Sequence, residues 1–279
     1  MTWKAYRVVF KLKSPVHIGC GKVGNVQRTR PYVTGRVFWG ALTMRLTRDA
    51  ISGTATDSSQ YKTFGDKVNE QLAYTYFYLA TKENGVYQIQ WPWGDEESLF
   101  RRRFLSSYTS TALMYLQQAA DEGLLHEVEF LSPRTLDEGE QVYLVGYVFE
   151  KEGCDLKWRD ACKHLQLGGE RGYGWGDVKC VEIKPLENHD LFEEQVTFNG
   201  DGDSPTIQAK RLLAHASSTG ITATGEIEPL VGREWRSNES TNKYAGQYVA
   251  FSDLCWVPGS VVERSLFVIR DFGIWHLSD

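Results

Sequence analysis

The chain contains at residues 167–176 the stretch Leu167-Gly168-Gly169-Glu170-Arg171-Gly172-Tyr173-Gly174-Trp175-Gly176, in which five glycines fall within nine residues. Glycine is favoured where the backbone takes positive φ or comes close to another group, and successive turn N–H groups can line an anion-binding concavity. Arg171 adds a cation, and Tyr173 and Trp175 add rings on which unpaired bases can stack. This glycine loop therefore suits a sugar-phosphate chain, although a tight turn with two packed rings would have the same composition.

The elements predicted around the glycine loop are a helix before it and a strand after it. Residues 158–167 have the pattern of a helix, and residues 177–183 have that of a strand. A dinucleotide-binding GxGxxG motif has the reverse order, because it follows a strand and opens a helix, and the phosphate-binding GxxxxGK[ST] motif is absent from the sequence. The usual nucleotide-binding motifs are therefore excluded.

A second glycine-rich stretch lies near the N-terminus. Residues 6–13 partly alternate, as a first strand should, and a loop at residues 16–25 (VHIGCGKVGN) follows. A short extended piece at residues 31–33 leads into a helix at residues 37–50, for which Thr34 is the expected N-cap. Four basic or titratable side chains gather in and just after the first loop: His17, Lys22, Arg28 and Arg30.

Strands dominate the prediction for the segment between the two glycine-rich stretches. The pair Asn84-Gly85 predicts a hairpin turn. Residues 51–66 are small and polar and predict an exposed loop. Residues 99–120 begin with Arg101-Arg102-Arg103 and have a partly helical pattern. Strands are predicted at residues 72–80, 86–91, 124–131 and 141–149.

The order of these elements predicts the fold class. Without the insertions it is strand, helix, two strands, helix, strand, which is the βαββαβ order of ferredoxin-like domains. This α+β fold has an open antiparallel sheet that serves many functions, RNA binding among them. After residue 185 the sequence is acidic and turn-rich and then holds short strands. We therefore expect a ferredoxin-like (RRM-like) domain with insertions at residues 1–185 and a β-rich C-terminal extension at residues 186–279.

Composition limits the classes of function. Hydrophobic residues make up 42% and aromatic residues 13% of the 279 residues, which indicates a folded globular chain. The five cysteines are widely spread without a CxxC pair, so we expect no disulfide framework, no metal site and no cofactor. Cys162 and His164 are the nearest approach to a ligand pair. Because the formal net charge is -5, any surface that binds nucleic acid must be local.

The sequence also lacks the usual signals for membranes and export. No apolar run approaches the roughly 20 residues of a membrane span. The first residues, MTWKAYRVVFKLKSP, lack the apolar core and small-residue cleavage site of a signal peptide. We therefore expect a cytoplasmic protein without a membrane partner.

Three motifs together resemble a known family. Residues 14–21 (SPVHIGCG) and 30–42 (RPYVTGRVFWGAL) resemble the N-terminal signature of the CRISPR-associated RAMP superfamily, which is a first strand, a glycine loop and the start of the first helix. Residues 111–112 and 123–129 resemble its middle stretch, and the glycine loop resembles its defining C-terminal loop. The motifs occur in the family's order and together cover roughly residues 3–184.

The resemblance implies a ferredoxin-like domain that binds CRISPR RNA as one subunit of a type III-like effector in antiviral defence. Its partners would be the guide RNA, the large subunit and the backbone RAMP subunits, with target RNA as a further possible contact. An acidic chain fits this role, because a subunit of a large assembly need not bind RNA alone. The expected RNA contacts are His17, Gly19, Gly21, Lys22, Arg28, Arg30, Tyr32, Arg36, Gly168, Gly169, Arg171, Gly172, Tyr173, Gly174 and Trp175.

The sequence departs from the family's RNA-cutting members at one position. In the type III backbone subunits that cut target RNA, a catalytic aspartate lies in the loop after the first strand. Residues 22–30 (KVGNVQRTR) contain no carboxylate that could hold the metal ion for such cleavage. We therefore expect a subunit that does not cut, which either caps the 5′ tag of the guide or belongs to the repeated backbone.

Two other functions stay open at this point. A metal-independent endoribonuclease that processes precursor CRISPR RNA would need a general base near the 2′-hydroxyl, for which His17 or His164 could serve. A structural adaptor without RNA contact would suit the acidic net charge, although the intact glycine loop and the basic cluster oppose it. The salt dependence of RNA binding separates a binder from an adaptor.

Overall fold

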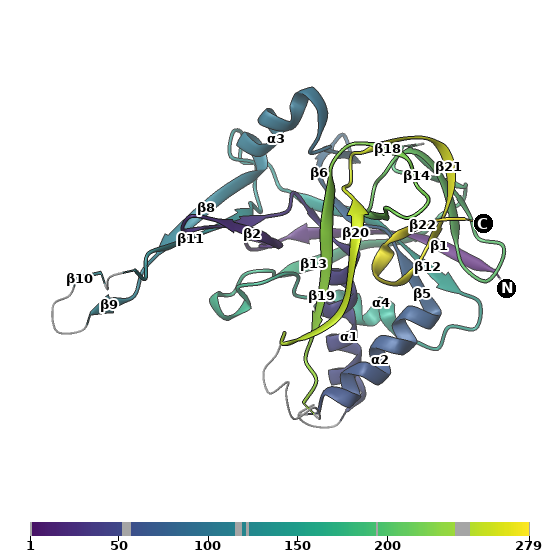
Figure 1. The fold of residues 1–279 in the computed structure, drawn as a ribbon, viewed down its shortest axis with the longest axis horizontal. Helices are drawn as coiled ribbons and strands as arrows, with labels where there is room; N and C mark the ends of the chain where they lie inside the picture. The colour runs from purple at the N-terminus through teal and green to yellow at the C-terminus, as the bar shows by residue number, and fades with distance from the viewer. Residues whose placement is uncertain are drawn as a thin grey trace.

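The computed structural model describes residues 2–51, 57–114, 119–120, 123–193, 195–237 and 246–278. It has the α+β architecture expected from the sequence. Figure 1 shows a body built of two sheet-rich parts, with α1 (Gly35–Ala50), α2 (Ser58–Gln71) and α4 (Trp158–Ala161) on one side, and one long hairpin that projects away from the body.

The secondary structure consists of many short strands and few helices. The helices are α1 (Gly35–Ala50), α2 (Ser58–Gln71), α3 (Glu97–Phe104) and α4 (Trp158–Ala161), with 3-10 turns η1 (Gly94–Glu96), η2 (Cys162–His164), η3 (Arg171–Tyr173) and η4 (Asp271–Gly273). The strands of the first part are β1 (Trp3–Leu12), β2 (Gly19–Val23), β3 (Val26–Thr29), β4 (Tyr32–Val33), β5 (Leu72–Tyr74), β6 (Phe77–Glu83), β7 (Val86–Ile89), β8 (Leu105–Ser110), β9 (Leu113–Met114), β10 (Ala119–Ala120), β11 (His126–Leu131), β12 (Tyr143–Lys151) and β13 (Val178–Pro185). The strands of the second part are β14 (Asp190–Leu191), β15 (Val196–Asn199), β16 (Thr206–Arg211), β17 (Ala216–Ser217), β18 (Ala223–Thr224), β19 (Ile227–Glu234), β20 (Tyr248–Trp256), β21 (Val261–Ile269) and β22 (Trp275–Leu277).

The first sheet has the ferredoxin-like topology that the element order predicted. Its strands lie in the order β13-β1-β12-β6-β4, and β1 pairs antiparallel with both β12 and β13. Helix α1 follows β1 in the chain, and α4 lies between β12 and β13. The four main strands therefore form a βαββαβ unit whose first strand is central.

Both faces of this sheet are buried, which explains why its strands alternate only in part. Even-numbered side chains of β1, such as Val8 and Phe10, join a core with α1 and α4. Odd-numbered ones, such as Trp3 and Ala5, join a second core with the C-terminal part. Because neighbouring side chains of a strand point to opposite faces, the sheet is the middle one of three layers.

Helix α1 packs on the first sheet through the apolar stripe that the sequence predicted. Phe38, Leu42 and Leu46 are buried, and the ring centroid of Phe38 lies 4.8 Å from that of Phe77. Thr34 is the N-cap residue in extended conformation, as expected, but its side chain makes no capping hydrogen bond. Instead its carbonyl oxygen accepts from the N–H groups of Val37 and Phe38.

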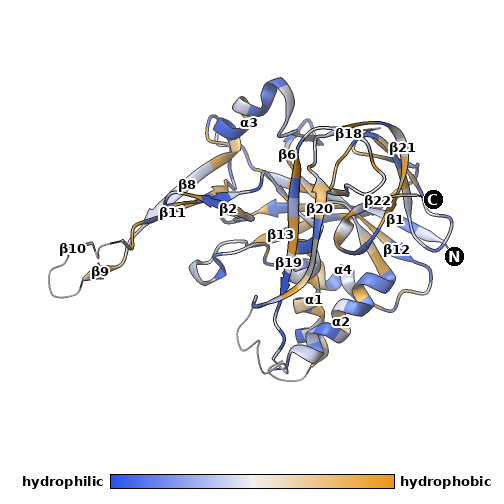
Figure 2. Cartoon of the chain, in the orientation of Figure 1, coloured by the Kyte–Doolittle hydropathy of each residue, from blue (hydrophilic) through white to orange (hydrophobic). Residues whose placement is uncertain are grey.

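The predicted exposed loop at residues 51–66 is wrong from residue 58 onward, where α2 begins; residues 52–56 lie outside the described part. Asp57 caps α2, because its carboxylate accepts from the Ser59 N–H at 2.9 Å. Figure 2 draws α2 mostly in blue and white. Its buried residues are only Ser58, Gly65 and Val68, so no clear apolar stripe marked the helix in the sequence.

The partly helical stretch expected at residues 99–120 is also corrected. Helix α3 ends at Phe104, and the next residues, Leu105-Ser106-Ser107-Tyr108-Thr109-Ser110, form β8. Tyrosine and threonine are enriched in strands, and the pairing of β8 with β11 gives this serine-rich segment its partner.

The expected loop at residues 16–25 is instead largely a hairpin. Strands β2 and β3 pair antiparallel around Gly24, which has a φ of +58°, and β3 also pairs in parallel with β11. The result is a small sheet of order β2-β3-β11-β8. In Figure 1 the β8–β11 hairpin extends from this sheet far beyond the body.

The C-terminal extension is β-rich, as expected, and packs on the first sheet. Its sheet has the order β14-β15-β16-β21-β22-β17-β20-β19, so β19 lies at one edge. Tyr76 and Tyr78 of the first part share a core with Phe192 and Trp275 of the second. The Tyr78 hydroxyl also donates to the Leu213 carbonyl at 2.8 Å. Residues on both sides of position 185 therefore build one continuous core.

Substitution of two glycines of α1 can show how tightly this helix packs against the C-terminal part. A Cβ added at Gly35 would collide with the backbone carbonyl of Phe272, whereas a Cβ at Gly40 would meet nothing within 4 Å. We expect Gly35→Ala to lower the free energy of unfolding by about 1–3 kcal/mol through overpacking. Gly40→Ala should leave it unchanged or raise it by about 0.5–1 kcal/mol. Urea unfolding of both variants measures this, and equal effects would contradict the packing.

Candidate functional site

Three segments far apart in the sequence meet at one cavity of about 530 Å³, which we name the central groove. They are the start of the first hairpin, the start of α1 and the glycine loop, and β19 forms a further wall through Leu230 and Arg233. The sequence-predicted contacts that line the groove are His17, Gly19, Arg30, Arg36, Gly168, Gly169 and Arg171.

Two further cavities adjoin the central groove and share lining residues with it. A cavity of about 580 Å³ shares Cys20 and Arg30 with the groove, and we name it the hairpin hollow. A cavity of about 460 Å³ between α1, α2 and the end of β19 shares Arg36 and Trp39. The predicted contacts Gly21, Lys22, Arg28 and Tyr32 line the hairpin hollow.

Backbone contacts between the two glycine-rich stretches build the groove. The Gly169 N–H donates to the His17 carbonyl at 2.9 Å, and the Gly176 N–H donates to the Pro15 carbonyl at 2.7 Å. Gly168 has a φ of +81°, and a Cβ there would collide with the His17 carbonyl. Only glycine fits this position, because it tolerates both the positive φ and the close approach.

Arg171 presents a cation at the edge of the groove. Its Nε donates to the Gly168 carbonyl at 3.0 Å, and its Nη1 lies 3.3 Å from the sulfur of Met44. Burial, and then the nearby Arg48, lower its pKa from the ordinary value. No carboxylate among the described residues forms an ion pair with Arg171. Within that part of the protein, its positive charge is therefore not neutralised.

The outer half of the glycine loop, residues 172–175, lies outside the central groove. Gly172 and Gly174 are exposed, and the Tyr173 side chain is 76% exposed. Trp175 is half-buried, with its ring centroid 5.0 Å from that of Phe130. Tyr173 and Trp175 line a separate cavity and do not contribute to the central groove.

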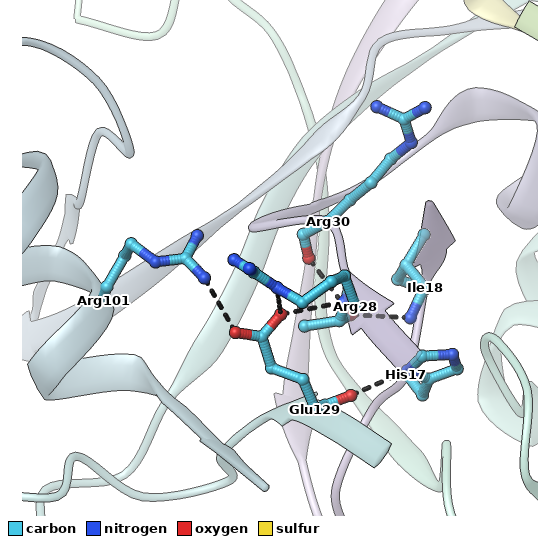
Figure 3. Close-up of polar contacts among 7 residues, drawn as sticks. His17, Ile18, Arg28, Arg30, Arg101 and Glu129 are labelled. Carbon is cyan, nitrogen blue, oxygen red and sulfur yellow. Dashed lines mark hydrogen bonds and ion pairs between the residues drawn. The ribbon is translucent and has the colours of Figure 1, made fainter. Parts of the chain in front are cut away.

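A single carboxylate holds two arginines beside the hairpin hollow (Figure 3). Glu129 accepts from Arg28 Nε at 3.0 Å and from Arg101 Nη2 at 2.7 Å. Its backbone carbonyl accepts from His17 Nδ1 at 2.7 Å. Two guanidinium groups share one carboxylate, so the cluster keeps a net positive charge. Sequence reasoning missed Glu129, and it noted Arg101 only within the arginine triplet.

Arg30 belongs to a buried chain of polar groups that links the two parts of the molecule. Its Nη1 donates to Glu228 Oε1 at 2.6 Å, and the same oxygen lies 2.5 Å from His215 Nε2. The Tyr76 hydroxyl lies 2.7 Å from His215 Nδ1. A neutral imidazole that donates from Nε2 and accepts at Nδ1 satisfies both bonds. Glu228 lies beyond the motifs and could not be singled out from the sequence.

The pKa values in this chain follow from burial and from the hydrogen bonds. Burial opposes ionisation of Glu228, yet hydrogen bonds from His215 and Arg30 hold its pKa at about 2, below the usual 4.5. Burial lowers the pKa of His215 below its usual 6.5. At neutral pH this chain of polar groups therefore contains an ionised Glu228 and a neutral His215.

Arg36 and Tyr32 have structural partners in the fold. The Arg36 guanidinium stacks on the rings of Trp39 and Phe272, at 4.5 and 4.3 Å from their centroids. Its Nη2 donates to Glu234 of β19 at 3.2 Å. Tyr32 is only 3% exposed and packs among the core tyrosines. Arg36 therefore fastens β19 to α1, and Tyr32 presents almost no surface to the hollow.

The two histidines proposed as general bases lie in different places. His17 lines the central groove, and a Cβ at Gly19 would lie 3.3 Å from its Nε2. His164 is exposed in another cavity, which Lys13 and Lys179 also line. Its sequence neighbour Cys162 is fully buried. Within the described ranges, no three His, Cys, Asp or Glu side chains form a group that could hold a metal ion.

Comparison with known proteins finds similarity in structure alone. No protein-family model and no curated protein sequence matches this chain. A chain in the cryo-EM structure of the type III-B Cmr-beta bound to cognate target RNA and AMPPnP, state 1, matches with a TM-score of 0.54 at 12% identity, over 92% of this chain and 85% of that one. This chain has the fold of a Cmr-beta protein chain. A chain of Cmr-beta bound to cognate target RNA matches with a TM-score of 0.51 at 12% identity, over 92% and 86% of the two chains.

The match shows that this chain shares its fold with a chain of a type III-B complex structure. It extends over 92% of this chain, so it includes most of the C-terminal extension, which the sequence motifs did not reach. In the parts of the chain that the structure describes, no helix combines the length and the apolar character needed to cross a membrane.

The polar chain through Glu228 predicts a pH-dependent stability. Because the folded-state pKa of Glu228 is about 2 against 4.5 unfolded, its stabilisation is complete above pH 4.5 and is lost as the pH falls toward 2. The lowered pKa of His215 adds a loss that begins below pH 6.5. We expect Glu228→Gln to be less stable than the wild type at pH 7 and to differ less from it at pH 3.

Urea unfolding at pH 7, 5 and 3 measures this difference. The neighbouring Glu226 is exposed, and its side chain forms no hydrogen bond or ion pair with the described residues, so Glu226→Gln is the matched control. A constant difference between wild type and Glu228→Gln across this range would contradict the assigned ionisation.

Proposed function

We propose that this chain is a non-catalytic subunit of a type III-like CRISPR effector that binds guide RNA along the central groove. The observation that carries the proposal is the meeting of three basic or glycine-rich segments at one cavity. There, close backbone packing positions Arg171 without a carboxylate partner among the described residues. Cations and bare backbone in a groove suit a sugar-phosphate chain.

The groove supplies the local positive charge that an acidic chain needs for RNA binding. Lys22 is exposed at the hairpin hollow, and Arg171 and Arg233 line the central groove. None of the three has an ion-pair partner among the described side chains. The formal net charge of -5 must then lie over other faces, where acidic groups suit contacts with neighbouring subunits.

The arginines held by Glu129 support phosphate binding in the hairpin hollow. A guanidinium has five N–H donors, and Glu129 accepts from one nitrogen of each arginine. The side chains of Arg28 and Arg101 remain 38% and 34% exposed. They are therefore held in place before RNA arrives, and both keep donors for a phosphate.

The carboxylates near the groove support a role without cutting. Residues 22–30 contain none. Glu129 and Glu228, which approach the groove from other strands, both form ion pairs with arginines. A carboxylate neutralised in this way is a poor ligand for the metal ion that cleavage of target RNA would need.

The proposed partners are the guide RNA, the large subunit and the backbone subunits of such an effector. The similar Cmr-beta chains belong to structures of a complex bound to cognate target RNA, so target RNA is a further proposed contact. A first experiment is to express the chain with its genomic neighbours and a CRISPR array, purify it by a tag, and sequence the bound RNA. Recovery of neither guide RNA nor effector subunits would contradict the proposal.

Removal of two cations should weaken RNA binding and its salt dependence. Each phosphate contact contributes roughly 0.7 to the slope of log K against log salt for single strands. We expect Lys22→Gln with Arg171→Gln to reduce the slope by about 1.4 and to leave the melting temperature unchanged. Fluorescence anisotropy with a guide-length RNA at several salt concentrations measures the slope. Lys210→Gln is the control, because Lys210 is exposed on β16 away from the groove.

A wild-type chain whose RNA binding shows no salt dependence would favour the structural adaptor instead. So would an unchanged slope in the double variant, because both cations would then lie outside the phosphate path. The effector assembly could still form in that case, which purification of the complex would detect.

One observation favours the alternative of an RNA-processing enzyme. His17 donates from Nδ1 to the Glu129 carbonyl, which leaves Nε2 as an acceptor beside Gly19 in the central groove. A neutral imidazole with this orientation could take a proton from a 2′-hydroxyl. If it does, purified protein should cleave repeat RNA without metal, and His17→Ala should lower the rate at least 100-fold.

The same assay separates the two histidines. His164→Ala is the matched control, because His164 lies in another cavity. We expect no cleavage of repeat RNA by the wild type. Cleavage that persists with EDTA and depends on His17 would overturn the non-catalytic proposal.

A further inference from the structure

A small pocket lies between the projecting hairpin and the outer half of the glycine loop. Its volume is about 210 Å³, and we name it the aromatic pocket. Pockets that hold drug-sized ligands have roughly 300–1,000 Å³, so this one suits a smaller planar group. Strands β8 and β11 contribute Tyr108, Ser110, His126 and Val128, and the glycine loop contributes Glu170, Tyr173 and Trp175.

Three aromatic rings give the pocket stacking surfaces. The Tyr108 and Tyr173 side chains are 61% and 76% exposed. Trp175 is half-buried and is braced edge-on by Phe130, with ring centroids 5.0 Å apart at 66°. A braced indole and two exposed phenol rings offer faces on which a nucleobase can stack.

Glu170 supplies the polar group of the pocket. Its φ of +55° lies in the left-handed region, where nearby loop positions 168, 174 and 176 have glycine. A non-glycine residue held in this conformation is costly and is found most often at functional positions. Its carboxylate makes no hydrogen bond or ion pair with any residue that the structure describes, and it lines the pocket.

The opposite wall is fixed by internal hydrogen bonds. His126 Nδ1 lies 3.1 Å from the Leu124 carbonyl, and His126 Nε2 lies 2.9 Å from the Ser110 hydroxyl. A carbonyl only accepts, so Nδ1 carries the proton and Nε2 accepts from the hydroxyl. Both nitrogens of this imidazole are therefore occupied, whereas Glu170 is the carboxylate among the residues that line the pocket.

We propose that the aromatic pocket binds one unpaired guanine base of the RNA. Guanine presents two adjacent donors, N1–H and the N2 amino group, which match the two oxygens of the Glu170 carboxylate. Adenine, cytosine and uracil each present a single donor on that edge. Two-point recognition of this kind discriminates between bases by roughly five- to 150-fold.

The pocket and the central groove lie on consecutive residues of the same loop. Gly169 lines the groove, and Glu170 lines the pocket, and consecutive Cα atoms are roughly 3.8 Å apart. The backbone of an RNA in the groove can therefore pass the loop while one base turns into the pocket. This inference rests on the proposed RNA binding and adds a base-specific site to it.

The test compares two RNA oligonucleotides that differ at one position, with guanosine or inosine in an otherwise uridine strand. Inosine keeps N1–H and lacks the N2 amino group. The full-length chain should bind the guanosine strand about tenfold more tightly, as measured by fluorescence anisotropy. Glu170→Gln should abolish this preference, because the amide offers one acceptor and one donor. Glu127→Gln on β11, outside the pocket, should retain it.

A second variant examines the stacking surface. Tyr173→Ala should weaken binding of the guanosine strand about tenfold, while Tyr173→Phe should match the wild type, because the ring face and not the hydroxyl makes the contact. Unchanged melting curves are expected for both, since Tyr173 is 76% exposed.

The outcomes separate this inference from the proposed function. Equal, salt-dependent binding of the guanosine and inosine strands would overturn the guanine site and leave RNA binding in place. A preference for guanosine that survives Glu170→Gln would overturn the assigned recognition group. Failure to bind either strand, together with no calorimetric difference between free guanosine 5′-monophosphate and inosine 5′-monophosphate, would overturn the guanine site. The proposed function would fall only if purification from cells also recovered neither guide RNA nor effector subunits.

Discussion

The contact between Gly168-Gly169 and the His17 carbonyl determines where every other part of the site lies. The Gly169 N–H donates to that carbonyl, and Gly168 leaves no room for a Cβ beside it. The approach brings the loop before β13 against the segment after β1, two strands that are already paired in the sheet. From this junction the loop has two sides, one at the central groove and one at the aromatic pocket. A larger side chain at position 168 would push the loop away from the segment after β1.

Acidic residues organise the basic ones in this chain. Glu129, Glu228 and Glu234 each hold an arginine from a distant segment. A rigid guanidinium loses less entropy when it meets a phosphate than a free one does, so these pairs need not oppose RNA binding. These ion pairs also explain how a chain of net charge -5 can have a basic groove. The three carboxylates hold arginine side chains in position at the groove and the hairpin hollow.

The sequence predicted the parts of the fold that depend on local pattern. The hairpin at Asn84-Gly85 and the βαββαβ order both follow from neighbouring residues. Helix α2 was missed because its buried residues are few and small. For the site, the motifs identified the segments that form the groove, but not their partners. Arg28 and Glu129 are 101 positions apart, and Arg30 and Glu228 are 198 apart. Only tertiary structure brings such pairs together.

The position of β19 has a consequence for biosynthesis. This strand forms one wall of the groove and is held by Arg30 and Arg36. Among the described strands it pairs with β20, whose residues come later in the chain. Strand β22 lies between β21 and β17 in the same sheet. Since chains emerge from the ribosome N-terminus first, the ferredoxin-like unit is made well before its groove has a second side. The proposed RNA-binding groove is therefore complete only after β19 and β20 have been synthesised.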